Sequence, residues 1–529
     1  MTTEGVVRRR RERLALWAAT LGNGPTELVD FVLPLWAGLA LGLGATEVGV
    51  LTAVEMAVSV LVRPVAGVLA DRCERRGVAA VGALLYAVSC AGYAVAGSAS
   101  VAYAAAAIGG AGGALLWVAL RAVASERLEE DSGVFPRLLA AEETGSWVAF
   151  VAGLALLGVI GFAGVFWLCA AACLLAAGCL LAAPRRPAPV GAAVSGGLGA
   201  VGRRLRPMLF AVAMTMAAEA AVSLLLLLHL QRGFGLEVVQ IAYVFLPGAI
   251  AMSVAAGYLH RYVVRFGRSR VLMTASLGSC AFAVGLAWAP NPYVVAGLWV
   301  LSGLAWAAVM PVQQAVVAEA SGDRVGRGMG VYESACLVGA LVGSLVAGVL
   351  YDGANWVVAC LVAGGMILAG AVVVPRAVRR LGVAEYPPPA VADTPSTPGP
   401  AASGAEVGSA ALPQAQVGSA ASPRVEAEPA ASPREDAVPG GKVRTKAELW
   451  RGLATNAALF AVTQAALAFA DLSWVRDLLT RDLGAVLLGQ VPREGVAAFA
   501  YGAGRVWAIV LLVDLVWTVY KVRRTRAPG

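Results

Sequence analysis

The sequence predicts an all-α polytopic membrane protein: two six-helix bundles, then a linker and about two further membrane helices. Of its 529 residues, 59% are hydrophobic and only 14% charged, whereas soluble domains have about 25% charged residues. Apolar runs of roughly 20 residues, the length that a membrane helix needs, recur along the chain. Cations gather in every second connection between these runs, as cytoplasmic loops require.

Twelve apolar runs account for the first three quarters of the chain. They lie at about 14–43, 47–69, 78–97, 99–125, 137–160, 163–183, 207–230, 238–260, 270–289, 292–318, 327–350 and 355–375. A basic, Gly/Pro-rich segment separates six runs from six. We therefore expect a basic N-terminus (1–13), a first bundle (14–183), a central loop (184–206) and a second bundle (207–380).

The charges of the connections predict the orientation. Alternate connections carry Arg72, Arg75, Arg76; Arg121, Arg127, Arg137; Arg185, Arg186, Arg203, Arg204, Arg206; Arg261, Arg265, Arg268, Arg270; Arg324, Arg327; and Arg376, Arg379, Arg380. The other connections contain one cation, Arg232. This asymmetry places the N-terminus and central loop in the cytoplasm. The first apolar run is too long for a signal peptide, so we expect a retained span in the cell membrane.

The last part of the chain has a different composition. Residues 381–443 are rich in Pro, Ala, Ser and Glu and repeat V-G-S-A-A and A-S-P-R. Such a segment cannot bury enough apolar surface to fold, so we expect a disordered linker. Residues 444–529 hold two more apolar runs, 449–472 and 497–520, which return the C-terminus to the cytoplasm. Any protein partner of this extension is unknown from the sequence.

The connection between the second and third runs is densely charged. It reads G-V-L-A-D-R-C-E-R-R-G at Gly67–Gly77. Between two membrane helices this must be a tight turn at the bilayer surface, because charges are disfavoured at the bilayer centre. The glycine allows close helix approach, and Asp71 can hold arginines or a helix N-terminus.

This turn resembles a known family signature. Its residues Gly67, Leu69, Ala70, Asp71, Arg72, Arg75 and Arg76 are similar to the loop 2–3 motif of the major facilitator superfamily. Glu74 stands where that family usually has glycine. The resemblance implies a transporter with two rocking bundles, similar to the drug-efflux branch. It also implies a conformational latch formed by Gly67, Asp71, Arg72, Arg75 and Arg76.

The second half repeats the first weakly. Gly257–Arg268 occupies the position of the latch motif, with Arg261 in place of the acid. Gly326–Gly348 resembles the eleventh span of the family, and its small residues suit close helix contact. Two family features are missing: Ala106 replaces an arginine of the fourth span, and Glu143–Gly153 lacks the proline of the exporter element.

Acids within the spans are the main candidates for function, because each is costly in lipid. Glu27 and Asp30 are three residues apart and share one helix face. Glu219 lies at matching depth in the seventh span. We expect these acids to face one cavity and to couple protons or bind substrate, with at least one of Glu27 and Asp30 protonated at neutral pH. The alternative is structural pairing with arginine.

Other polar residues of the spans are weaker candidates. Gln313 and Gln314, after Pro311, can hydrogen-bond a solute. The charged residues Glu55, Arg63, Arg121 and Glu142 are possible pairs, with Glu55 beside Arg63 and Glu142 beside Arg121. The stretch G-N-G-P at 22–25 is expected to break the first helix.

The composition excludes several classes of protein. The net charge of +8 belongs to cytoplasmic loops rather than to a nucleic-acid surface, and seven of eight cysteines lie in apolar runs as packing residues. We expect no cofactor and no metal. The leading hypothesis is a secondary transporter that exchanges a small organic solute for protons, with the bilayer as its other partner. Proton-coupled uptake is the nearer alternative; a scaffold or sensor and a membrane enzyme are the others.

Overall fold

A computed structural model describes residues 3–186, 197–236, 238–353 and 356–387, together with scattered positions between 450 and 519. Every long element in these ranges is a helix, which confirms the all-α prediction. The helices are α1 (Thr3–Ala40), α2 (Ala45–Arg72), α3 (Arg75–Val95), α4 (Ala99–Ser125), α5 (Val134–Ala182), α6 (Leu198–Arg232), α7 (Val238–Phe266), α8 (Arg268–Leu286), α9 (Pro292–Ser321), α10 (Val325–Gly353), α11 (Trp356–Arg380) and the short α13 (Trp474–Thr480).

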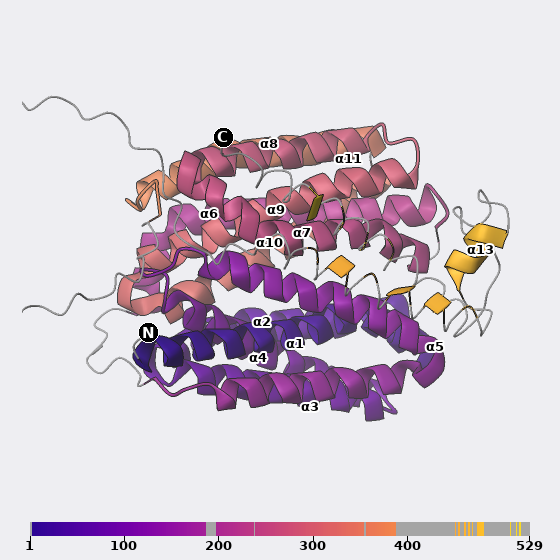
Figure 1. The fold of residues 1–529 in the computed structure, drawn as a ribbon, viewed down its shortest axis with the longest axis horizontal. Helices are drawn as coiled ribbons and strands as arrows, with labels where there is room; N and C mark the ends of the chain where they lie inside the picture. Colours follow the sequence, from indigo (N-terminus) through magenta and orange to yellow (C-terminus); the bar gives the residue numbers. More distant parts are fainter. Residues whose placement is uncertain are drawn as a thin grey trace, which may run out of the picture.

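Helix α5 consists of two helices joined at Gly161. This residue has φ 66° and ψ −178°, a left-handed φ that favours glycine because it lacks a Cβ. The chain reverses there (Figure 1). With α5 divided, α1–α11 provide the twelve segments that the apolar runs predict.

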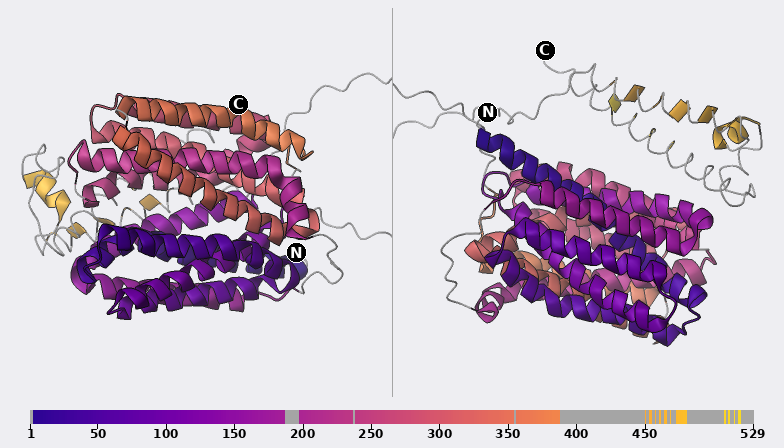
Figure 2. Two further views of the ribbon diagram at one scale, coloured as in Figure 1. Left: turned by 180° about the vertical axis from the view of Figure 1, so that it is seen from behind. Right: turned by 90° about the horizontal axis from the view of Figure 1, so that it is seen from below.

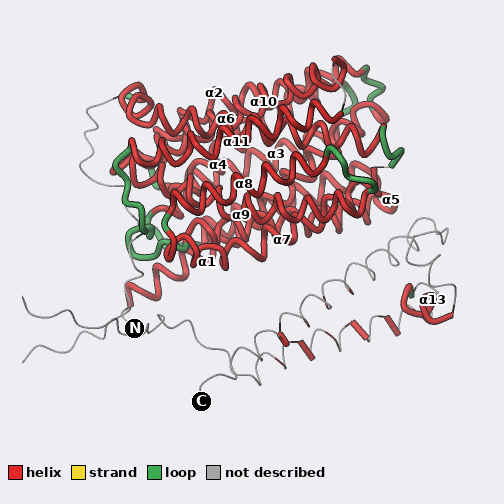
Figure 3. The backbone as a smooth tube through the Cα atoms, turned by 90° about the horizontal axis from the view of Figure 1, so that it is seen from above, coloured by secondary structure: helices red, strands yellow, loops and turns green. Residues whose placement is uncertain are grey.

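The twelve segments form two halves with the same internal pairing (Figures 1 and 2). In the first half α1 packs on α5, α2 on α4, and α3 on α4. The second half repeats this with α6 on α10, α7 on α9, and α8 on α9. The halves meet through α2 against α10 and through α5 against α7. All of these helices run along one common direction (Figure 3).

Small residues allow the helices to approach at backbone distance. A Cβ on Gly145 of α5 would lie 2.1 Å from the Thr20 carbonyl oxygen of α1. The equivalent pair in the second half is Gly343 and Ala217, at 2.0 Å. Without a hydrophobic driving force between helices in lipid, such close packing is what holds them together.

Eight helical segments of the described chain are long and apolar enough to cross a membrane. These segments omit α7, α1 and the first part of α5, the last two of which carry Glu27, Asp30 and Glu143. The chain is thus a multi-pass membrane protein.

Three expectations need revision or lie outside the described residues. Helix α1 is continuous through Pro25, because Gly24 packs at backbone distance on Gly145 instead of marking a break. Residues 381–387, assigned to the linker, contact α8: the Arg268 N–H donates to the Glu385 carbonyl at 2.9 Å. The rest of the linker and most of the two extra spans are not described.

Candidate functional site

Asp71 joins the two halves by capping a helix of the opposite half. Its Oδ1 accepts the Gly326 N–H at 2.7 Å and its Oδ2 accepts the Arg327 N–H at 3.1 Å. These amides belong to the first turn of α10, where the helix dipole favours a negative charge. The Arg327 guanidinium lies 3.8 Å from the same carboxylate. The aspartate was expected to bind arginines or a helix end, and here it binds both, across the halves.

The arginines of the turn stay within the first half. Arg75 donates to the Ala122 carbonyl at 2.9 Å, at the end of α4. Arg76 donates to the carbonyls of Leu181, at 2.8 Å, and Ala183, at the end of α5. Cations at helix C-termini are favourable for the same reason that Asp71 is at an N-terminus. The turn therefore binds the ends of two helices of its own half, α4 and α5, and presents Asp71 to the other half.

Glu74 replaces the family glycine without backbone strain. It is the residue before α3 and has φ −65°, ψ 113°, which any residue adopts. Its carboxylate pairs with Arg76 at 2.5 Å. Arg72 is exposed and has no ion pair among the described residues, so within the motif the contact across the halves belongs to Asp71 and Gly67.

Glycines bring α2 and α10 together beside Asp71. A Cβ on Gly67 would lie 2.5 Å from the Gly326 carbonyl oxygen, and one on Gly330 would lie 2.5 Å from the Arg63 carbonyl oxygen. Real Cβ atoms essentially never come so close. The cap on α10 therefore depends on glycine at these positions.

A buried charge network lies between the halves, further from the end of α2 than Asp71. Glu333 of α10 accepts from Arg63 of α2 at 2.8 Å, and Arg121 of α4 lies 2.8 Å from its other oxygen. Arg121 also pairs with Glu142 of α5 at 3.5 Å. All four side chains are at most 10% exposed. Glu333 thus connects the second half to two helices of the first.

The structure corrects one expected pair and supplies a missing partner. Arg63 binds Glu333 rather than Glu55, whereas Arg121 and Glu142 meet as expected. Residues eight apart are about 12 Å apart along a helix, and Glu55 instead lies against α4, its Oε1 3.2 Å from a Cβ placed on Gly109. The sequence does not single out Glu333, because small residues dominate the span in which it lies.

The acids of α1 form a cluster with Glu55. The carboxylates of Glu55 and Glu27 both repel that of Asp30, and Glu143 repels Glu27. Glu27 and Asp30 are exposed and Glu55 is half-buried. No arginine, lysine or histidine in the described ranges pairs with any of these four acids.

Glu219 and the two glutamines have different surroundings. Trp306 Nε1 of α9 donates to Glu219 Oε2 at 2.5 Å, so this acid is held within the second half. Gln313 and Gln314 are 0% and 1% exposed, and their amide atoms have no hydrogen-bond partner among the described residues. That Glu27, Asp30 and Glu219 line one cavity stays a prediction.

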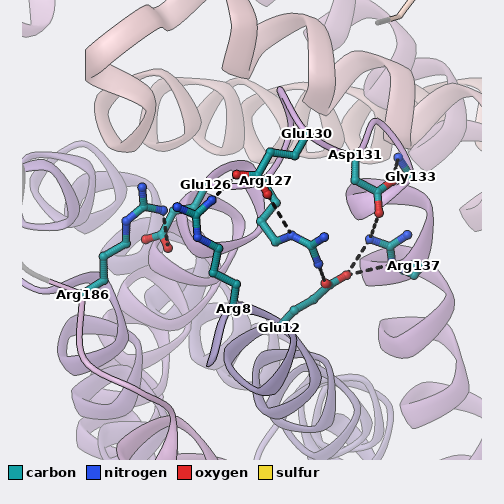
Figure 4. Close-up of polar contacts among 9 residues, drawn as sticks. All are labelled: Arg8, Glu12, Glu126, Arg127, Glu130, Asp131, Gly133, Arg137 and Arg186. Carbon is teal, nitrogen blue, oxygen red and sulfur yellow. Dashed lines mark hydrogen bonds and ion pairs between the residues drawn. The ribbon is translucent and has the colours of Figure 1, made fainter. Parts of the chain in front are cut away.

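A weaker contact joins the halves at α7. The Ser132 hydroxyl and His260 Nε2 lie 3.0 Å apart. Beside them, Asp131 Oδ1 accepts the Gly133 N–H at 2.9 Å, at the start of α5 (Figure 4). Burial acts to raise the pKa of Asp131, but its hydrogen bond from Arg137 and the charge of that arginine hold the pKa below its usual range.

The polar contacts between the halves share one location. Helices α2, α4 and α5 terminate at one end of the molecule, where the N-terminal arginines also lie; we call this the basic end. Asp71 lies at this end. Val60 precedes it by eleven residues on α2 and therefore lies about 17 Å deeper in the helix; its carbonyl accepts a hydrogen bond from Ser334 at 3.4 Å. Helices α1 and α6 have few contacts with each other. The halves are therefore joined from the basic end inward.

Fold and site together define a membrane protein of two pseudo-equivalent helical halves that meet through charged and glycine contacts. Sequence comparison agrees: a model of the Major Facilitator Superfamily matches residues 16–263 and 208–514. The chain belongs to the Major Facilitator Superfamily, and we describe it as a transporter of that family.

Solved structures share the fold. The human organic anion transporter MFSD10 (TETRAN) aligns with a TM-score of 0.58 and 20% identity, over 69% of this chain and 99% of that one. The proton:xylose symporter XylE, bound to 6-bromo-6-deoxy-D-glucose, aligns with a TM-score of 0.57 and 15% identity, over 70% and 95%. At this identity the likeness concerns the fold alone.

Curated relatives match over a shorter region. The lysophospholipid transporters LplT of Salmonella heidelberg (strain SL476) and Salmonella typhi are 35% identical over 109 residues, which is 20% of this chain. The match spans about a quarter of their length, 26%.

Proposed function

We propose that this transporter exports a small, positively charged organic solute in exchange for protons. The observation that supports this most directly is the acid cluster of Glu27, Asp30 and Glu55, with Glu143 beside it. Asp30 is within electrostatic reach of Glu27 and Glu55, and Glu143 is within reach of Glu27. None of the four acids pairs with a cation among the described residues. Several uncompensated acids on membrane helices suit a site that holds either protons or a cationic solute.

Competition at the acids supports exchange of the solute for protons rather than symport. A proton and a cationic solute that need the same carboxylates cannot occupy them together. Each crossing then exchanges one for the other, and an inward proton gradient drives the solute outward. Uptake by symport would instead need a solute site that remains available when the acids are protonated.

The contacts between the halves fit alternating access. With the basic end in the cytoplasm, as the arginine distribution favours, the Asp71 cap and the Glu333 network close the cytoplasmic side. We propose that Gly67, Asp71, Arg75 and Arg76 act as the latch of this closed state, with Arg72 at its surface. Access from the cytoplasm requires these contacts to break as the halves rock.

Transport in liposomes tests the proposal. Purified protein would be reconstituted with an imposed pH gradient, and movement of tetraphenylphosphonium and of protons would be measured together. We expect opposite fluxes in the wild type. Glu27→Gln or Asp30→Asn should abolish uphill transport while leaving downhill exchange. The matched control is Glu129→Gln, an exposed acid in the α4–α5 connection, which should behave as wild type.

Three outcomes would contradict the proposal. Proton and solute fluxes in the same direction would establish symport. Wild-type coupling in both acid variants would remove these acids from the mechanism. Absence of flux for any organic cation or neutral solute from a correctly folded protein would favour a scaffold or sensor role.

A further inference from the structure

A cavity that is partly open to the surface lies in the first half, away from the acid cluster. Its volume is about 300 Å³, at the lower limit of ordinary small-molecule pockets. It is enclosed by the first turns of α1, the end of α4, the start of α5 and the segment that follows α5. Arg11, in its wall, is sixteen residues before Glu27 on α1, about 24 Å along the helix. The cavity is therefore at the basic end.

Arginines dominate the polar wall of this cavity. Five of them line it, against two glutamates: Arg8, Arg11, Arg127, Arg185 and Arg186, with Glu12 and Glu126. The polar contacts around it are drawn in Figure 4. With Glu130, which pairs with Arg8 and Arg127 from outside the wall, the ion pairs of this region join six arginines to four acids. The region therefore keeps an excess of positive charge.

The sharing is explicit in the ion pairs. Glu126 forms ion pairs with three arginines: Arg11 at 3.1 Å, Arg186 at 3.4 Å and Arg75 at 3.5 Å. Glu12 serves Arg127 and Arg137. A carboxylate neutralises one cation, so Arg11 and Arg186, which share Glu126, can accept a further anion. Arg8 and Arg127 are instead paired with Glu130 as well.

Two arginines have unused donors. Arg11 is 7% exposed and binds the Pro184 carbonyl at 2.7 Å, but its buried Nε has no acceptor among the described residues. A buried donor without a partner costs about 1–3 kcal/mol. Arg185 is exposed and has no ion pair in the described ranges.

The remaining wall is apolar. Leu16, Leu120, Val123 and Leu138 line the cavity together with smaller residues. Guanidinium groups above an apolar floor match a ligand that carries an anionic head on an apolar body. Arginine binds phosphate in bidentate fashion, which a carboxyl-poor, arginine-rich wall favours.

We propose that this cavity binds the phosphate group of an amphipathic ligand and so forms an anion site separate from the transport pathway. The same chemistry is available from an anionic phospholipid of the bilayer or from a soluble phosphate ester. Occupancy would tie α1, α4 and α5 together at the end that meets the second half.

Binding to the full-length protein in nanodiscs separates the two sources. One arm compares discs of phosphatidylcholine with discs that also contain phosphatidylglycerol, and measures bound lipid by native mass spectrometry. The other adds phenyl phosphate to phosphatidylcholine discs and measures the shift in unfolding temperature, since a ligand stabilises the state that it binds. We expect saturable binding in at least one arm.

Variants localise the binding. Arg185→Gln removes an exposed guanidinium and should weaken binding about tenfold, the loss of one charged hydrogen bond. Ala124→Phe fills the cavity and should abolish binding. Arg204→Gln, an exposed arginine of α6 outside the cavity, should bind as wild type.

The proposal is overturned if neither probe binds the wild-type protein. It is also overturned if Arg185→Gln and Arg204→Gln weaken binding equally, which would indicate general surface attraction. Should Ala124→Phe fail to fold, the comparison of the two exposed arginines still decides the matter.

Discussion

Replacing Glu333 by glutamine should open the contact between the halves at the basic end. The carboxylate of Glu333 is the shared partner of Arg63 and Arg121, both at 2.8 Å and almost fully buried. Glutamine keeps the shape and the bond from Arg63 to the carbonyl of residue 333, at 2.7 Å. Among the described residues it leaves Glu142, 3.5 Å from Arg121, as the one carboxylate paired with the two buried guanidinium groups.

The magnitude follows from the burial of this network. Removing one partner of a buried ion pair costs about 3–5 kcal/mol. In a conformation where the halves separate and water reaches the arginines, the loss is about 0–1 kcal/mol, as for exposed pairs. The substitution therefore favours the separated conformation by about 2–5 kcal/mol, which changes the ratio of the two conformations about 30- to 4,000-fold.

Distances between spin labels would measure this shift. Glu129 and Asp323 are exposed residues in connections at the basic end, one in each half. Cysteines introduced at these two positions can carry the labels after the exposed Cys73 is replaced by serine. Double electron–electron resonance should give a longer distance population in Glu333→Gln than in the parent.

The matched control is Glu319→Gln. Glu319 pairs with Arg268 at 2.5 Å, but both residues belong to the second half, so the loss of this pair should not separate the halves. The reasoning is refuted if Glu333→Gln leaves the distance distribution unchanged, or if Glu319→Gln alters it to the same extent.

Three further predictions concern the same interface and the end of the second half. Asp71→Asn keeps one acceptor for α10 but loses the charge, which costs about 0.5–2 kcal/mol; transport in liposomes should slow several-fold with insertion intact, and wild-type rates would remove Asp71 from the latch. Gly67→Ala places a methyl group 2.5 Å from a carbonyl of α10 and should slow transport, whereas Gly77→Ala, with nothing within 4 Å, should not; equal rates would contradict the packing argument. A protein ending at Pro387 should insert, transport and unfold at the parental temperature, whereas one ending at Val383 loses the contacts with α8 and should unfold earlier; an inactive but stable protein ending at Pro387 would place the last spans in the transport machinery.

Hydrophobic length and arginine distribution predict the fold because both act locally. Each apolar run specifies a helix through its own residues, and the break between 160 and 163 is visible as a glycine before a second run. The motif at 67–76 likewise predicts a turn that binds a helix end. What the motif does not specify is that this helix end is more than 250 residues away.

The Arg121–Glu142 pair of the charge network was predicted from the sequence, but the contact of Arg63 with Glu333 could not be, for the same reason. Arg63 has Glu55 eight residues before it, but its partner Glu333 is 270 residues distant, and only the packing of α2 on α10 brings the two together. Glu27 and Asp30 are recognisable because a charge in an apolar run stands out alone. Gln313 and Gln314 show the limit of that rule, since polarity within a span did not indicate that both amides are buried in helix packing.

The glycine contacts make the smallest residues of this chain, rather than the largest, the positions that tolerate substitution least. At Gly67, Gly145, Gly330 and Gly343, even one added carbon atom meets backbone of another helix at 2.5 Å or less, and backbone cannot rotate away as a side chain can. The bulky residues Leu175, Leu345 and Val349 are more than half exposed, so their side chains have room to change. A saturation library scored for transport should therefore be depleted at the smallest residues of this chain and tolerant at many of its largest.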